Sequence, residues 1–250
     1  MPLIGKKYLG RVELVPSAQD KDLNPTRILT YNEQDNEVKY SDINFVPQEN
    51  LVNYDVATNS DVINNGNNNS FPLAFQTLTN KVCFVYREGI GHIGNDSKLI
   101  LLKSSDGGKN FESSTIVYEE GVDSRNMAVG VTPTGRIVLF YYRVNSDINQ
   151  ALSMVYIYSD DEGITWSEKI NVPVAEPLYS PYGQIINIAS DKMAMNYYAI
   201  DTATNTYSVY MLFSTDNGAT WGDKKTVITT TTRRYTEADF AYLDLSLIHI

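Results

Sequence analysis

Three stretches of the sequence follow one pattern, S-x-D-x-G-x-T/N-W/F: Ser104-Ser-Asp-Gly-Gly-Lys-Asn-Phe111, Ser159-Asp-Asp-Glu-Gly-Ile-Thr-Trp166 and Ser214-Thr-Asp-Asn-Gly-Ala-Thr-Trp221. Their aspartates, Asp106, Asp161 and Asp216, are separated by 55 residues each time. Serine and aspartate side chains accept hydrogen bonds from turn backbone, and glycine takes a positive φ without strain. The pattern therefore predicts three equivalent hairpin turns in a repeated structural unit.

The positions that recur in all three turns are expected to be structural. The closing aromatic should pack beneath the turn, while the aspartate and glycine fix its backbone. The structural residues predicted on this basis are Asp106, Gly108, Asp161, Gly163, Trp166, Asp216, Gly218 and Trp221.

Strand-like runs, rich in aromatic and β-branched residues, surround each turn. Four strands are predicted per unit: first strands over 71–77, 126–132 and 183–188, second strands over 82–86, 137–142 and 193–198, third strands over 98–103, 152–158 and 207–213, and fourth strands over 114–118, 168–172 and 224–229. Four antiparallel strands repeated in this way are typical of the blades of a β-propeller.

The repeated turn resembles the Asp-box, or bacterial neuraminidase repeat, and the sequence from about Phe71 onward resembles the sialidase superfamily. The resemblance implies an all-β fold, a β-propeller of four-stranded antiparallel blades that has six blades when complete. Residues 71–244 would supply about three and a half blades, ending with the opening strand of a fourth. Residues 1–70 would form a lead-in, which could include a ring-closing strand, and residues 245–250 read like a translated sequencing adapter and are expected to be a non-native tail.

Composition excludes several classes of function. The chain carries 20 Lys+Arg against 30 Asp+Glu, a formal charge of -10, which argues against nucleic acid or an anionic membrane as partner. One cysteine, Cys83, and two histidines do not supply a zinc cluster, and we expect neither a metal nor a cofactor. No run is long and apolar enough for a membrane span, and no signal peptide is visible. Through the resemblance we expect an extracellular, cell-surface or virion location, with an oligomer if the chain comes from a phage tail.

The alternation of strand direction predicts where chemistry would lie. The Asp-boxes connect third to fourth strands, so the loops between second and third strands, and those leading into the next blade, should meet at the opposite end. Arginines, carboxylates and tyrosines concentrate in those loops. The candidates are Glu237 as acid/base, His92 as a group that binds or protonates substrate, and Arg87, Asp123, Arg125, Arg143 and Tyr182 as substrate-binding residues.

Each candidate has a structural alternative. Arg87 could form an ion pair with Glu88 or Asp123, and Asp123 with Arg125 could tie two blades together. Glu237 could be a solvated carboxylate beside Arg233 and Arg234. His92 could simply bond to loop backbone, and Arg143 and Tyr182 could only pack at strand ends.

In sialidases three arginines clamp the sugar carboxylate, an Asp is the acid/base, and a Tyr activated by a Glu is the nucleophile. Here Ser70-Phe-Pro72 stands where the family places its first arginine, and His92 stands where it places the Asp. The stretch Tyr235-Thr-Glu237-Ala-Asp-Phe resembles the segment that carries the catalytic Glu. The other two arginines and the tyrosine would follow Ile250, so we expect the 250-residue chain to be inactive by itself. Phage endosialidases also lack the first arginine and the usual Asp.

The resemblance therefore implies a sialidase-like glycoside hydrolase acting on sialic acid or a related acidic glycan. A non-catalytic glycan-binding propeller of a phage or bacterial surface protein is the alternative, favoured by Ser70 and His92 at former catalytic positions. A third hypothesis, a scaffold propeller that holds protein partners, predicts no glycan binding at all.

Overall fold

A computed structural model describes residues 27–32, 37–42, 63 and 65–240. The chain divides into two compact units, one of which spans Asp61–Phe240. In the other, β1 (Arg27–Asn32) and β2 (Glu37–Asp42) form an antiparallel hairpin within the predicted lead-in. The predicted tail at 245–250 lies outside the described residues. No helix among the described residues is long and apolar enough to cross a membrane.

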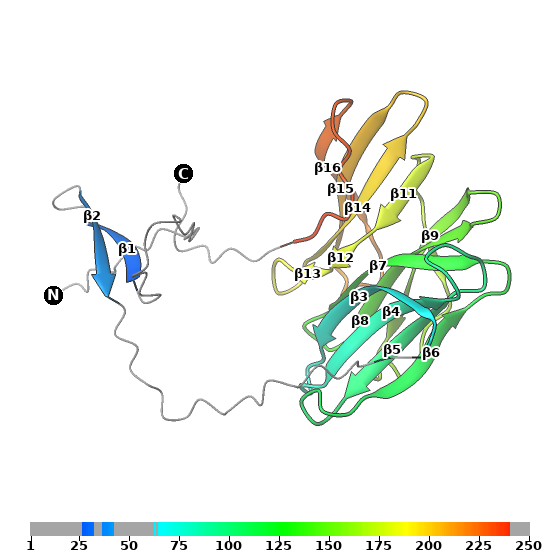
Figure 1. The fold of residues 1–250 in the computed structure, drawn as a ribbon, viewed down its shortest axis with the longest axis horizontal. Coiled ribbons are helices and arrows are strands. Elements are labelled where there is room, and N and C mark those ends of the chain that lie inside the picture. Colours follow the sequence, from blue (N-terminus) through cyan, green and yellow to red (C-terminus); the bar gives the residue numbers. More distant parts are fainter. Residues whose placement is uncertain (1–26, 33–36, 43–62, 64, 241–250) are drawn as a thin grey trace. The chain divides into compact units, whose positions relative to one another are not determined.

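The unit Asp61–Phe240 contains three sheets, antiparallel except for one short pairing, which follow one another in chain order and are called the first, second and third blades (Figure 1). The first blade consists of β3 (Asn68–Gln76), β4 (Val82–Gly89), β5 (Lys98–Ser104) and β6 (Glu112–Tyr118). The second consists of β7 (Asp123–Val131), β8 (Ile137–Asn145), β9 (Gln150–Ser159) and β10 (Ile170–Val172). The third consists of β11 (Leu178–Pro181), β13 (Ile186–Asn187), β14 (Met193–Asp201), β15 (Thr206–Ser214) and β16 (Gly222–Thr230), and β12 (Gly183–Gln184) extends the second.

The predicted all-β blade architecture is confirmed, with one correction in the third blade. Its inner strand, predicted as one piece over 183–188, was wrong in extent and continuity. It begins at Leu178 and is divided among β11, β12 and β13, and β12 pairs in parallel with β7 of the second blade. The break occurs where Gly183 takes a φ of 84°, which ends the antiparallel ladder. The opening strand of a fourth blade, predicted to begin near Glu237 and to continue toward residue 244, lies largely outside the described residues.

The hydrophobic core lies between neighbouring blades, and β8 shows why its sequence has no charged residue from Ile137 to Tyr142. Leu139 and Tyr141 pack in the cluster shared with the first blade, whereas Val138 and Phe140 pack in the cluster shared with the third. Successive side chains of a strand point to opposite faces, so a blade covered on both faces needs an uninterrupted apolar strand. The middle blade is thus sandwiched by its neighbours, as in a propeller.

The Asp-box turns have the hydrogen bonds that the sequence predicts. In the second box, Ser159 Oγ accepts from Gly163 N (2.8 Å) and Asp161 Oδ1 accepts from Thr165 N (2.8 Å). Thr165 Oγ1 donates to Asp161 Oδ2 (2.6 Å). Trp166, which closes the turn, packs against the core between the first and second blades. The boxes therefore fasten the β-hairpins to the core.

These hydrogen bonds make the stability of the turn depend on pH. The Thr165 side chain and backbone, with Ser159, lower the pKa of Asp161 to about 2. A folded-state pKa below the ordinary value of about 4 adds stability that is complete above pH ~4 and is lost as the pH falls towards 2. Asp161→Asn should therefore melt below the wild type at pH 6, with the difference shrinking between pH ~4 and ~2. Thermal unfolding followed by circular dichroism measures this, with Asp191→Asn, an exposed turn aspartate, as control.

Candidate functional site

The two ends of the blades carry different loops, as the alternation of strand direction predicts. The turn between β3 and β4 reaches the second Asp-box, where Lys81 Nζ lies 2.5 Å from Glu162 Oε2. The turn between β7 and β8 reaches the third box, where Thr134 Oγ1 donates to Asn217 Oδ1 (2.8 Å). The loops after β4 and β8 and the start of β7 meet at the other end, which holds the candidate site.

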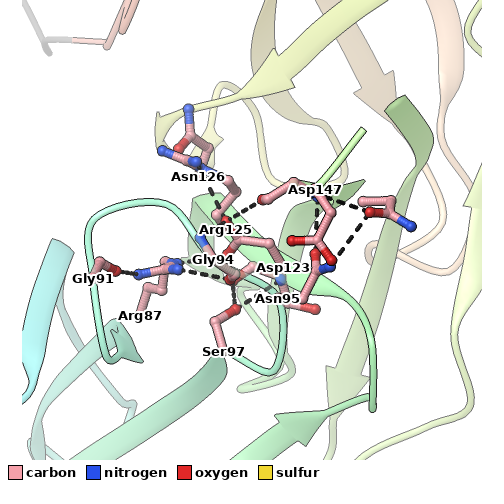
Figure 2. Close-up of polar contacts among 12 residues, drawn as sticks. Arg87, Gly91, Gly94, Asn95, Ser97, Asp123, Arg125, Asn126 and Asp147 are labelled. Atoms are coloured by element: carbon pink, nitrogen blue, oxygen red, sulfur yellow. Dashed lines mark hydrogen bonds and ion pairs between the residues drawn. The ribbon is translucent and has the colours of Figure 1, made fainter. Parts of the chain in front are cut away.

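Arg87, at the end of β4, lies at the centre of this end and has no exposed surface. Its Nε donates to Asp123 Oδ1 at 2.7 Å, its Nη1 to the Gly91 carbonyl at 2.8 Å and its Nη2 to the Gly94 carbonyl at 3.1 Å (Figure 2). The ion pair with Asp123 that was an alternative for Arg87 is thus present and joins two blades. In this geometry Arg87 holds the loop after β4 and does not face the solvent.

Asp123, at the start of β7, is also fully buried and uses both of its carboxylate oxygens. Its Oδ2 accepts from Ser146 Oγ (2.8 Å) and from Gly94 N (3.3 Å), and it lies 3.4 Å from Arg125 Nη1. One carboxylate therefore holds two loops and two guanidinium groups. Since it neutralises only one of the two arginines, the cluster keeps an excess of positive charge.

Beside this cluster lies a cavity of about 220 Å³ between the second and third blades. Arg125 and Arg234 both contribute to its wall. Among the described residues that line the cavity, none is an aspartate or a glutamate. The remaining lining residues are apolar, aromatic or neutral and polar: Ile93, Asn126, Tyr142, Val144, Ser146, Asn149, Leu178, Tyr179, Ser180, Tyr198 and Ile200.

Tyrosines form much of the cavity wall. Burial raises the pKa of Tyr142 to about 12, and burial likewise raises the pKa of Tyr179. Their rings meet edge to face, with centroids 5.7 Å apart. Both phenols are therefore neutral at physiological pH and offer hydroxyl groups together with apolar ring surface, a combination that suits a sugar.

A repeated backbone feature connects the inner strands with this site. Phe71, Asn126, Gly183 and Glu237 have φ values of 57°, 47°, 84° and 55°, at successive spacings of 55, 57 and 54 residues. The pairing of β3 with β4 is irregular at Phe71, and the pairing of β7 with β8 is irregular at Asn126. Bulges of this kind redirect a side chain and are common beside binding sites. Glu237 repeats the conformation at the corresponding place after the third blade.

Two other predicted residues lie near the cavity without lining it. His92 is exposed, and its ring centroid is 5.4 Å from that of Phe71, whose ring also lies 5.3 Å from the Arg125 guanidinium carbon. Arg143 is held on the flank of the second blade, because its Nε donates to Glu119 Oε2 (3.1 Å) and its Nη1 to Ser153 Oγ (2.9 Å).

Tyr182 and Glu237 are close enough to influence each other. Burial raises the pKa of Tyr182, and the carboxylates of Glu237 and Asp239 raise it further. Asp239 Oδ1 accepts from Gln184 N at 2.8 Å, which anchors the segment carrying Glu237 to the third blade. Tyr198, which lines the cavity, also contributes to the environment of Tyr182. The Glu237 carboxylate is thus within electrostatic range of Tyr182, and neither residue lines the cavity.

Of the residues that line the cavity, only Arg125 had been named as a candidate, and three of the others bear on its chemistry: Asn126, Tyr198 and Arg234. Asn126 could have been found from the period, because it follows Phe71 by 55 residues. Arg234 lies three residues before Glu237, where it was considered only as a charged neighbour. Tyr198 ends the predicted second strand of its blade, and its role depends on a contact with Asn126, 72 residues away, which a local sequence pattern cannot predict.

The chain matches the sequence profile of the BNR repeat-containing family over residues 26–236. It is also similar to a sialidase of Paraclostridium sordellii, with 26% identity over 146 residues, covering 48% of this chain and 36% of that protein. The chain therefore spans about a third of the length of this curated relative.

Solved structures show the same fold at low sequence identity. A protein of unknown function from Dyadobacter fermentans has a TM-score of 0.58 and 19% identity, covering 70% of this chain and 59% of its own. The NanB sialidase of Streptococcus pneumoniae has a TM-score of 0.53 and 11% identity, covering 67% and 46%. An α-L-arabinanase of Penicillium chrysogenum, complexed with arabinobiose, has a TM-score of 0.50 and 16% identity, covering 66% and 50%.

The sialidase and the arabinanase share only the fold with this chain at these identities. The family profile, in contrast, extends over most of the sequence, and the three Asp-box turns close the three blades that it covers. The chain belongs to the BNR repeat-containing family and folds as part of a sialidase-like β-propeller that resembles those of glycoside hydrolases.

Proposed function

We propose that this protein is a sialidase-like glycoside hydrolase that acts on sialic acid or a related acidic glycan, and that the cavity between the second and third blades receives the anionic group. One observation carries the proposal: Arg125 and Arg234 line the same cavity, and the described lining residues include no carboxylate. Guanidinium groups are well suited to bind a carboxylate because they offer parallel N–H donors.

The surroundings of Arg125 support this assignment. Its guanidinium lies beside the buried Asp123 and over the ring of Phe71, so its position is set before a ligand arrives. A preorganised donor loses less conformational entropy on binding than a mobile surface arginine. The tyrosine rings of the cavity add apolar surface for a sugar ring.

For hydrolysis, Glu237 is the proposed acid/base. It lies near Tyr182 and repeats the left-handed backbone conformation of Phe71 and Asn126. We propose that His92 and the buried pair Arg87–Asp123 act from the rim and the interior of the same end, the pair by holding loops in place. An extracellular, cell-surface or virion location would agree with such a substrate and is part of the proposal.

A non-catalytic glycan-binding propeller is the second candidate. It is favoured by Ser70, which stands where the resemblance leads one to expect an arginine, and by the exposed His92 in place of an aspartate. Hydrolysis of a fluorogenic sialoside by the full-length protein, lost in Glu237→Gln, would support the enzyme. Glycan binding without turnover would support the binding module.

Binding of 3′-sialyllactose to the chain tests the shared part of both candidates. Arg125→Gln and Arg234→Gln should each weaken binding by about 10- to 100-fold, since a hydrogen bond to a charged group contributes about 1.5–3 kcal/mol. Isothermal titration calorimetry or saturation-transfer NMR gives the affinities. Lactose and arabinobiose, which are neutral, should bind more weakly than 3′-sialyllactose.

Arg233→Gln is the matched control, because Arg233 is the exposed neighbour of Arg234 and does not line the cavity. It should bind 3′-sialyllactose like the wild type. An equal loss in Arg233→Gln and Arg234→Gln would argue for general charge attraction. No binding of any acidic glycan would favour the scaffold hypothesis.

A further inference from the structure

We infer that Asn126 is a positioning residue that makes the Tyr198 hydroxyl a hydrogen-bond donor to the anionic group of the ligand. The inference rests on the proposed function, since it assumes an acidic glycan in the cavity. It assigns a role to two residues that line the cavity together with Arg125 and Arg234.

The direction of one hydrogen bond is the first step. Asn126 Nδ2 donates to the Tyr198 hydroxyl oxygen at 3.1 Å. No other hydrogen bond of this hydroxyl is found within residues 65–240. A phenolic hydroxyl has a single proton to donate. Because its oxygen already accepts from the amide, the proton of Tyr198 is left for an acceptor that the protein itself does not supply.

Asn126 makes this contact from an uncommon backbone conformation. Its φ is 47°, and it is the irregular residue in the pairing of β7 with β8. It is only 7% exposed, and its Oδ1 is buried without a partner among the described residues. Strained backbone and an unsatisfied buried amide both cost stability and are concentrated at functional sites. Asn126 is also the only residue with such an unpartnered atom that lines the cavity within the described chain.

The charge of the cavity identifies the missing acceptor. Arg125 and Arg234 supply N–H donors, and the described lining carries no carboxylate. An anionic ligand group would therefore meet donors from two guanidinium groups and from Tyr198. A hydroxyl that donates to an anion makes a shorter and stronger hydrogen bond than one that donates to a neutral oxygen. The hydrogen bond from the Asn126 side-chain amide polarises the Tyr198 hydroxyl and strengthens it further as a donor.

The test compares 3′-sialyllactose with lactose on Asn126→Gly and Tyr198→Phe. Glycine adopts a φ of 47° without strain, so Asn126→Gly removes the amide while preserving the backbone. Each variant should lose about tenfold in affinity for 3′-sialyllactose, about 1.4 kcal/mol, and little for lactose. The double variant should lose no more than Tyr198→Phe alone, because Asn126 acts only through the Tyr198 hydroxyl.

Asn80→Gly is the matched control, since Asn80 also has a positive φ (63°) but is exposed in the turn between β3 and β4 and does not line the cavity. It should bind both sugars like the wild type. An equal loss for both sugars in Asn126→Gly, or additive losses in the double variant, would indicate a merely structural role and overturn the inference. Unchanged 3′-sialyllactose binding in Tyr198→Phe would overturn it too, leaving the proposed function intact. A wild type that binds no acidic glycan overturns both, and melting temperatures near the wild-type value show that the variants fold.

Discussion

Asp123→Asn is expected to lower the free energy of unfolding by about 3–5 kcal/mol, because it leaves the Arg87 guanidinium buried without a counter-charge. Both side chains are fully buried, and their 2.7 Å contact joins the first blade to the second. The amide also replaces an acceptor of the Ser146 hydroxyl and the Gly94 N–H. At about 2–4 °C per kcal/mol for a domain of this size, the melting temperature should fall by roughly 10 °C. Chemical denaturation followed by tryptophan fluorescence measures the change.

Asp160→Asn is the matched control for this prediction. Asp160 makes a bidentate ion pair with Arg136, but its side chain is 59% exposed. Exposed pairs contribute about 0–1 kcal/mol, so this variant should be nearly as stable as the wild type. Combining Asp123→Asn with Arg87→Met removes both charges and should recover part of the loss. Similar losses in the two asparagine variants would contradict the role of burial.

Gly130→Ala is expected to destabilise the protein by about 3 kcal/mol, at the upper end of the usual cost of overpacking. A Cβ at Gly130 would lie 2.2 Å from the Ile185 carbonyl oxygen. That oxygen belongs to the backbone, which cannot rotate away as a side chain can. The two strands are also joined here by the parallel pairing of β12 with β7 and by the hydrogen bond from Ile185 N to the Val129 carbonyl (2.8 Å). The second and third blades would have to separate to admit the methyl group.

Gly222→Ala provides the comparison, because a Cβ at Gly222 meets no atom within 4 Å. This variant should stay within about 0.5 kcal/mol of the wild type. Chemical denaturation gives the free energies of unfolding of the two variants, and Gly130→Ala should be the less stable. Equal stabilities would mean that the contact between the inner strands can relax at little cost.

The strands could be predicted because their signals are local. The Asp-box turns combine glycine, aspartate and a closing aromatic within eight residues, and their spacing repeats. The predicted ends of most strands differ from the observed ones by only a few residues. The inner strand of the third blade was not predictable in this way. Its division depends on the backbone approach of Ile185 to Gly130, which are far apart in the sequence.

The candidate site, too, could be predicted from the sequence only in part. Which loops share one end of the blades follows from strand alternation, and Arg125 and Glu237 could be named from it. Whether an arginine is buried or lines a cavity could not be predicted, because nothing in the neighbouring sequence distinguishes Arg87 from Arg125. Only the structure shows that Arg87 is enclosed by loop carbonyls and Asp123, whereas Arg125 borders the cavity.

The repeat, the blade architecture and the end of the blades at which charged loops gather could all be predicted from residue order, because each depends on turn chemistry and on the two-residue period of strands. The tertiary structure decided which side chains are buried as ties between blades, which line the cavity, and in which direction Asn126 and Tyr198 are hydrogen-bonded. Those properties arise from packing between segments about 20 to 70 residues apart, and a local pattern carries no information about which distant group will be the partner.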